Sequence, residues 1–167
     1  MKRFIAAGVL ALCLMASQIA HADENRDAKI KAEMRQNYLL WQEAWKHQDA
    51  ERIISFESPD FTSRIETESV HSKEESDDDW RSVMKIIKKV HDARMMIKKL
   101  TIEPNRVVIL SSCYLDVDVL FTKGPLHRLT SVVQSQEIWI EYDGIWMLKR
   151  MEQSRAKVTI DGKPEPS

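Results

Sequence analysis

Four segments in the C-terminal half of the chain alternate apolar and polar residues, the pattern of β-strands with one buried face. They span residues 94–102, 106–122, 127–142 and 145–155, with an extension over 158–160. In residues 106–122 the odd positions are nearly all apolar, whereas the even positions include Asp116 and Asp118. Short connections, one of them Asp143-Gly144, favour hairpins. The pattern predicts an antiparallel sheet whose apolar face needs a cover.

Amphipathic helices earlier in the chain can supply that cover. Residues 27–46 place apolar side chains on one face at spacings of three and four: Ile30, Met34, Tyr38, Trp41 and Trp45. The two tryptophans therefore indicate a core stripe first and an aromatic binding box only second. Residues 72–91 form a similar helix, whose buried stripe is Trp80, Val83, Met84, Ile87 and Val90.

Polar residues mark the boundaries of these helices. Asp49 can cap a short helix that ends before Pro59, because the residue before a proline avoids helical geometry. A weak strand or hairpin over 60–71 follows it, with Phe61 among its apolar residues. Ser72 and Glu75 have the spacing of a capping box for the next helix. The order of elements is therefore ααβαββββ, which is an α+β fold.

The N-terminus has the three parts of a secretory signal peptide. Lys2 and Arg3 precede an apolar run over 4–15, and Ala20-His21-Ala22 offers small residues for cleavage. The run is too short to span a bilayer as a helix of about 20 residues. A buried N-terminal helix and a membrane anchor are the alternatives to cleavage after Ala22. We expect a periplasmic or secreted protein with no membrane attachment after cleavage.

Cleavage would leave 145 of the 167 residues, enough for one domain with a core of its own. We assign residues 1–22 to the signal peptide, 23–162 to the domain and 163–167 to a polar tail. Removing Lys2 and Arg3 leaves 23 basic and 26 acidic residues, so the net charge is about −3. That balance argues against nucleic acid as a partner. Cys113 is then the sole cysteine, which excludes an internal disulfide.

Two stretches resemble the nuclear transport factor 2-like superfamily, whose cone-shaped fold is also called cystatin-like or SnoaL-like. They are "WQEAWKHQDAERIISFESPDF" (41–61) and "SQEIWIEYDGIWMLKRMEQSRAKVTIDGKP" (135–164). The resemblance covers roughly residues 30–162. It implies helices packed on a curved antiparallel sheet, a pocket at the wide end of the cone and, in many members, a homodimer formed through the sheet.

A pocket in that cone would be lined from both layers. We assign these residues to the pocket or the core around it: Tyr38, Trp41, Trp45, Phe61, Trp80, Met84, Cys113, Leu115, Val117 and Gln136. No cofactor is implied.

A steroid-isomerase-like member would need a tyrosine on the first helix and a carboxylate at the end of the first strand. Tyr38 is the first-helix tyrosine, but Arg64 falls where the base should lie, and an arginine cannot act as a base. Glu66 can replace it if the register slips by two residues. His127, beside the loop at Gly124, can reach a pocket mouth, although a solvated loop histidine is the simpler interpretation.

Other candidate sites have simpler explanations. Asp116 and Asp118 share the wetter strand face, which favours a solvated or dimer-rim pair over acid–base catalysis. The histidines lack zinc-site spacing. "EESDDD" (74–79) lacks the ligand spacing of a calcium loop and suits a helix N-terminus. Cys113 lies in an apolar alternation, so a core thiol is favoured over a nucleophile. No metal site is predicted.

Three hypotheses remain. The first is a non-catalytic protein that binds a small apolar or amphipathic ligand in its cone. The second is a small isomerase or lyase that uses Glu66 and Tyr38, with His127 or Gln136 near the pocket. The third is a dimeric interaction module with a filled cone. An enzyme should show an ionisable side chain that points into the cone and has a partner within hydrogen-bond reach.

Overall fold

The structure is a computed structural model that describes residues 3–66, 68–121 and 124–164, with side chains from Glu24 onward except that of Arg155. The chain divides into two compact units, residues 1–34 and residues 35–167. The first is helical over its described part and belongs to α1 (Arg3–His47). Among the described residues, no helix has both the length and the hydropathy needed to cross a membrane. Residues 1–2 and the side chains of the expected cleavage site lie outside the described residues, so cleavage stays a prediction.

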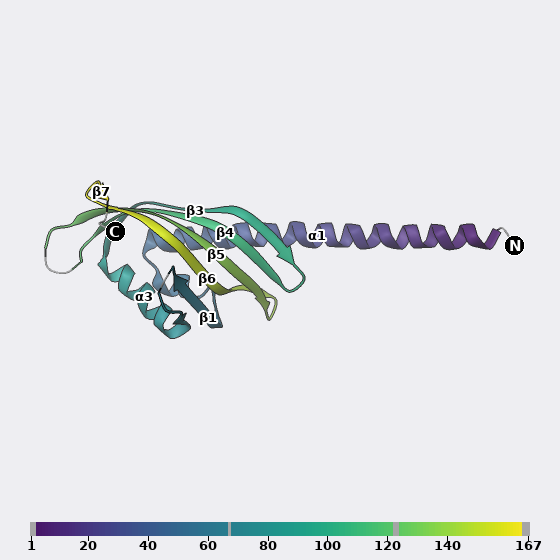
Figure 1. Ribbon diagram of the computed structural model, residues 1–167, viewed down its shortest axis with the longest axis horizontal. Coiled ribbons are helices and arrows are strands. Elements are labelled where there is room, and N and C mark those ends of the chain that lie inside the picture. The colour runs from purple at the N-terminus through teal and green to yellow at the C-terminus, as the bar shows by residue number, and fades with distance from the viewer. Residues whose placement is uncertain (1–2, 67, 122–123, 165–167) are drawn as a thin grey trace. The chain divides into compact units, whose positions relative to one another are not determined.

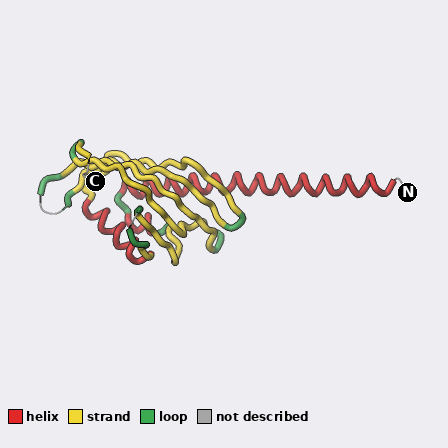
Figure 2. The backbone as a smooth tube through the Cα atoms, in the orientation of Figure 1, coloured by secondary structure: helices red, strands yellow, loops and turns green. Residues whose placement is uncertain are grey.

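The second unit segregates its helices from its strands, as the sequence predicted (Figure 2). After α1 its elements are α2 (Ala50–Ile54), β1 (Glu57–Ile65), β2 (His71–Ser72), α3 (Lys73–Ile86), β3 (Ile87–Glu103), β4 (Arg106–Val119), β5 (His127–Tyr142), β6 (Ile145–Ile160) and β7 (Lys163–Pro164). The expected order is confirmed, with the two-residue strands β2 and β7 added.

The strands form one curved sheet in the order β2-β1-β6-β5-β4-β3, and β7 pairs with β6 (Figure 1). The long strands β3 to β6 are antiparallel to their neighbours. Only β1 runs parallel to its neighbour, β6, within the described sheet. The α+β cone expected from the sequence is therefore present, and its sheet is mixed because of this one pairing.

The predicted helix caps are both present. The Asp49 carboxylate accepts a hydrogen bond from the backbone N–H of Arg52 at 2.9 Å. Ser72 accepts from the backbone N–H of Glu75, whose carboxylate accepts from the backbone N–H of Ser72 at 2.8 Å. These bonds satisfy N–H groups that a helix start leaves free.

Two boundaries differ from the prediction. The helix expected to continue to about residue 91 ends at Ile86, and β3 begins at Ile87, where it pairs with Val119. Pro59 does not end the short helix but lies inside β1, where the register with β6 shifts between Glu57 and Thr62. A proline donates no hydrogen bond, so such an irregularity suits it.

The C-terminal boundary differs as well. The expected extension over 158–160 belongs to β6. Lys163 and Pro164 of the expected tail pair with it as β7, whereas residues 165–167 lie outside the described residues.

The core lies between the inner face of the sheet and the helices of the second unit. Trp41, Trp45 and Val117 are each at most 5% exposed, whereas Trp80 is half-buried. The alternation of β4 is confirmed, because Val107, Ile109, Ser111, Val117 and Val119 are all buried. The inner face of β4 is therefore the odd face predicted from the sequence.

Candidate functional site

A cavity of about 210 Å³ lies between the inner face of the sheet and the helices of the second unit. Residues from α1, β1, β2, α3 and the strands β3 to β6 surround it. They are Trp41, Trp45, Ser63, Arg64, Ile65, His71, Ser76, Asp79, Trp80, Val83, Met95, Ser111, Cys113, Leu115, Val133, Ser135, Glu137, Met151 and Gln153. Nine of these nineteen residues are polar or charged, but the surface that they present to the cavity is mostly apolar, as in many small-molecule sites.

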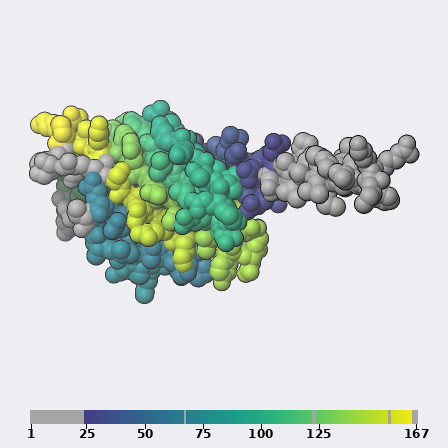
Figure 3. Space-filling model, turned by 45° about the vertical axis from the view of Figure 1, so that its right-hand side comes forward, coloured from purple at the N-terminus to yellow at the C-terminus, as the bar shows by residue number. Residues whose placement is uncertain are grey.

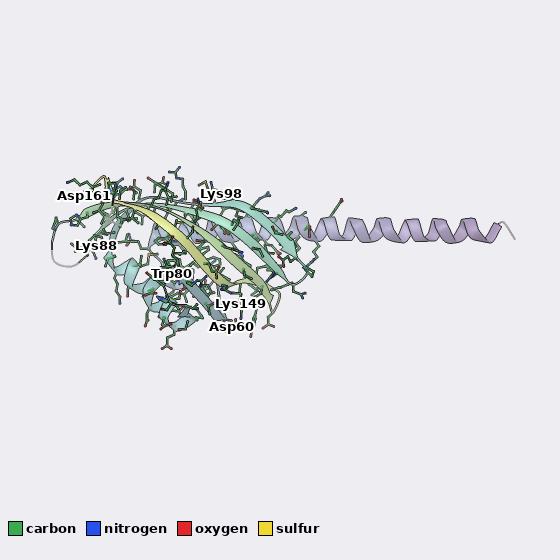
Figure 4. All side chains as sticks on the ribbon, in the orientation of Figure 1. Asp60, Trp80, Lys88, Lys98, Lys149 and Asp161 are labelled. Carbon is green, nitrogen blue, oxygen red and sulfur yellow. The ribbon has the colours of Figure 1, made fainter. Side chains whose placement is uncertain are left out.

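Aromatic rings form one side of the cavity. Trp45 of α1 meets Trp80 of α3 edge to face, with ring centroids 5.6 Å apart. Trp80 lies between α3 and the strands (Figure 4), and its Nε1–H donates to the Glu57 carboxylate at 2.7 Å. Trp41 packs edge to face on Trp139 at 6.2 Å. Edge-to-face pairs of this kind are a favoured aromatic geometry and stabilise the packing of the wall.

Strand register places polar side chains in a row across the floor. Ser111 of β4 lies opposite Ser135 of β5, which lies opposite Gln153 of β6. All three line the cavity. The neighbouring row contains Glu137, opposite Ile109 and Met151.

Glu137 is the most deeply buried ionisable side chain of the cavity wall, at 1% exposure. Its carboxyl group accepts hydrogen bonds from Tyr38 Oη and Ser111 Oγ, both at 2.6 Å, and from Trp139 Nε1 at 2.9 Å. Burial raises the pKa of Glu137, although these hydrogen bonds oppose the rise. Burial and the neighbouring Glu137 also raise the pKa of Tyr38. The carboxyl group is therefore held by three partners that carry no charge.

A histidine and an aspartate meet at the cavity rim. His71 Nδ1 of β2 lies 2.8 Å from Asp79 Oδ2 of α3, and both residues line the cavity. The pairing leaves His71 Nε2 without a partner in the described part of the chain. Arg64 lines the same cavity, and its guanidinium lies 3.3 Å from Glu152.

Five of the residues that we assigned to the pocket line this cavity: Trp41, Trp45, Trp80, Cys113 and Leu115. Four others are buried in the core outside its lining: Tyr38, Phe61, Met84 and Val117. Gln136 is exposed and does not line this cavity; it lines a second depression, which shares Arg64, Ser111, Ser135 and Gln153 with the cavity. Because side chains alternate along a strand, Gln136 and the inward-facing Glu137 lie on opposite faces, which corrects the expected place of Gln136.

The three candidate catalytic residues do not meet. Tyr38 is bound to Glu137. Glu66 follows β1 in a left-handed conformation, with φ 43°, and lines the second depression but not the cavity. His127 Nδ1, at the start of β5, lies 2.8 Å from Asp161, which follows β6, and neither residue lines the cavity. The proposed trio therefore forms no common site.

The other candidate catalytic groups are either paired with a neighbouring side chain or largely buried. Asp116 is paired with Arg128, which lowers the pKa of Asp116, and Asp118 lies 2.8 Å from His91. Burial raises the pKa of the Cys113 thiol to about 12, so it is protonated near neutral pH. Within the residues that the structure describes, no group of three or more His, Cys, Asp or Glu side chains is arranged to hold a metal ion.

Sequence reasoning missed His71, Asp79 and Glu137. Glu137 did carry a signal, because it shares strand parity with Ser135 and Trp139 and so faces the core. His71 and Asp79 carried none, since their contact depends on the path of the chain between β1 and α3.

Solved structures with the same arrangement identify the fold. A ketosteroid isomerase-like protein from Erwinia carotovora atroseptica SCRI1043 matches with a TM-score of 0.60 and 15% identity, over 74% of this chain and 93% of that chain. A hexachlorocyclohexane dehydrochlorinase, LinA type 2, matches with a TM-score of 0.66 and 13% identity, over 87% of this chain and 94% of that chain.

A nuclear transport factor 2-like protein of unknown function from Pseudomonas putida KT2440 matches with a TM-score of 0.55 and 13% identity, over 76% of this chain and 87% of that chain. No protein-family model and no curated protein matches the sequence. The chain contains a domain with the nuclear transport factor 2-like cone fold, as the resemblance in its sequence predicted. Proteins with this fold include both ligand-binding proteins and isomerases or dehydratases.

Proposed function

We propose that this protein is exported to the periplasm or beyond and binds a small, mainly apolar ligand in its cavity. One observation carries the proposal: Trp41, Trp45 and Trp80 form an aromatic wall of the cavity, and the apolar side chains Leu115, Val133 and Met151 contribute to its floor. Apolar surface facing an open cavity gains free energy when a ligand displaces water from it. The residues expected to support isomerase chemistry do not gather there.

Native mass spectrometry of protein purified from its own host tests the proposal. We expect a retained small molecule in the wild type. Ser135→Trp would fill the cavity from its floor and abolish retention, whereas Gln134→Trp is the matched control, because Gln134 is exposed on the other face of the same strand. Equal retention in both variants would contradict binding in this cavity.

Export is tested separately by the intact mass of the same protein. Cleavage after Ala22 gives a chain that begins at Asp23. Ala22→Leu removes the small residue that the peptidase reads and should leave the longer chain. A wild-type mass that includes residues 1–22 would exclude the proposed signal.

We also propose a homodimer formed through the outer face of the sheet. Met96, Leu110 and Val132 are exposed there on neighbouring strands β3, β4 and β5, and these strands (teal to green) contribute much of the surface seen in Figure 3. Light scattering after size exclusion should give the dimer mass for the wild type and the monomer mass for Leu110→Lys. Ile145→Lys, at the exposed start of β6, should leave the mass unchanged. A monomeric wild type at micromolar concentration would count against the dimer.

An isomerase or lyase is the second candidate, and the His71–Asp79 pair favours it. An ionisable side chain with a partner at 2.8 Å lines the cavity, which is the feature expected of an enzyme. Asp79 can hold the proton of His71 on Nδ1, which leaves Nε2 as a base. His71 Nε2 would take a proton from a carbon next to a carbonyl group, and the electron pair left behind would form an enolate.

Exchange of hydrogen for deuterium in phenylacetone tests this candidate without knowledge of the substrate. In heavy water the wild type should accelerate exchange at the carbon beside the carbonyl group. His71→Gln should abolish the acceleration. His91→Gln should preserve it, because His91 is paired with Asp118 at the same distance but lies outside the cavity lining. Exchange no faster than in buffer would leave binding as the function.

A further inference from the structure

Ser76 of α3 is a buried polar side chain that faces the cavity without a partner. It is 4% exposed and lines the cavity. Within the described part of the chain its hydroxyl group makes no hydrogen bond. The hydroxyl oxygen is not among the fully buried side-chain atoms that lack a partner, so it is accessible from the cavity. A molecule in the cavity can therefore serve as its hydrogen-bond partner.

Trp41 contributes to the same wall, but its Nε1 is fully buried and has no hydrogen-bond partner among the described residues. The Ser76 hydroxyl is therefore the donor that a ligand in the cavity can reach. A serine hydroxyl can donate to an acceptor atom on that ligand.

The charged groups around the cavity are already paired. His71 lies against Asp79, and Arg64 lies 3.3 Å from Glu152. Glu137 is buried among three donors that carry no charge. An ionic ligand would enter without a free counter-charge, which is costly in an apolar site. The wall therefore favours an uncharged ligand.

The volume limits the size of that ligand. A dry cavity of about 150 Å³ accommodates benzene, whereas sites for drug-sized ligands span about 300–1,000 Å³. The cavity here measures about 210 Å³. It therefore suits a molecule of one ring with a short substituent.

We propose that the cavity binds an uncharged, single-ring ligand whose carbonyl or hydroxyl oxygen accepts a hydrogen bond from Ser76. The aromatic wall formed by Trp45 and Trp80 contacts the ring. This inference rests on the proposed binding function and names the chemistry of the ligand.

Three probe ligands of similar size test separately the need for an acceptor oxygen and the need for an uncharged ligand. Acetophenone carries a carbonyl oxygen, cumene replaces it with a methyl group, and benzoate replaces the methyl ketone with a charged carboxylate. We expect acetophenone to bind the wild type about tenfold more tightly than cumene, the usual effect of one hydrogen bond. Benzoate should bind most weakly. Titration followed by ¹H–¹⁵N NMR measures all three affinities and reports the Trp indole N–H signals.

Ser76→Ala tests the donor itself. It should reduce the preference for acetophenone over cumene to about twofold or less. Ser112→Ala is the matched control, because Ser112 is also 4% exposed but does not line the cavity. It should keep the tenfold preference. The ranking of the probes on the wild type tests the ligand chemistry independently of how well either variant folds.

The possible outcomes distinguish a failure of the proposed ligand chemistry from a failure of the proposed binding function. Equal binding of acetophenone and cumene to the wild type would overturn the role of the oxygen while leaving apolar binding intact. Benzoate that binds as tightly as acetophenone would overturn the uncharged ligand. An unchanged preference in Ser76→Ala would overturn the role of Ser76. If none of the probes binds, the single-ring ligand is wrong, and a protein that also retains nothing in native mass spectrometry would overturn the binding function itself.

Discussion

Tyr38 of α1 donates a hydrogen bond to Glu137 of β5 at 2.6 Å, and this bond joins residues 99 positions apart in the buried core. Ser111 and Trp139 complete the set of donors around the same carboxyl group. A buried polar group costs little only when its partners are present. This network therefore fixes the register of α1 against the sheet.

Tyr38→Phe should destabilise the domain. The change removes one donor from Glu137 and leaves a buried acceptor short of a partner, which costs about 1–3 kcal/mol. Urea unfolding followed by tryptophan fluorescence measures the loss. Tyr142→Phe is the control, because Tyr142 is 47% exposed. Equal effects of the two changes would show that the network adds nothing to stability.

Glu57 should make stability depend on pH. Its carboxyl group is 3% exposed, and burial raises its pKa from 4.5 to about 7, although bonds from Trp80 and Lys73 oppose the rise. The folded state therefore keeps a proton that the unfolded chain loses. The stability associated with Glu57 is complete below about pH 4.5 and decreases as the pH rises through 7.

Glu57→Gln removes this titration. The free energy of unfolding of the wild type, relative to this variant, should fall by about 3 kcal/mol between pH 4.5 and pH 8. Urea unfolding across that range measures the difference. The exposed Glu141→Gln change serves as the control. A constant difference between the wild type and Glu57→Gln would mean that Glu57 titrates normally.

Cys113 should resist alkylation in the folded protein. With a thiol pKa of about 12, only about one molecule in ten thousand carries a thiolate at pH 8. In a chain that begins at Asp23, Cys113 is the sole cysteine, so mass spectrometry gives the extent of labelling directly. Iodoacetamide should modify the protein in urea at least a hundredfold faster than in buffer. Comparable rates would indicate an accessible, reactive thiol.

Ser72→Ala should weaken α3. It removes the side chain that caps the Glu75 N–H, a change that costs about 1 kcal/mol at helix starts. Ser82→Ala is the control within the same helix, because Ser82 is exposed and alanine favours helix there. Thermal unfolding should show a lower Tm for the first change only. A Tm that is unchanged in both would indicate that the cap is dispensable.

The helical layer and the sheet could be predicted from the sequence, because the spacing of apolar residues indicates which face of each element is buried. Trp41 and Trp45 share a helical face, and Ile109 and Val117 share a strand face, so each pattern named its own buried side. The end of α3 was not readable. Ile87 continues the helical spacing, but its pairing with Val119 places it in β3, and such distant pairing overrides local preference.

Only part of the cavity lining could be predicted from the sequence, because contacts between distant positions leave no local pattern. Cys113 and Leu115 followed from strand parity, whereas the donors to Glu137 come from positions 38, 111 and 139. The His71–Asp79 pair joins β2 to α3 through a turn without periodicity. Polar sites of this kind depend on distances that only the folded chain defines.

The parallel pairing of β1 with β6 has a consequence for how the chain reaches its final form. Arg64 lies opposite Glu152, 88 positions further along. A chain emerging from the ribosome N-terminus first must wait for its last long strand before β1 can take its place. Until then its aromatic side chains are exposed to other molecules, and contacts so distant in sequence form slowly. Newly made protein is therefore most prone to aggregation during this interval.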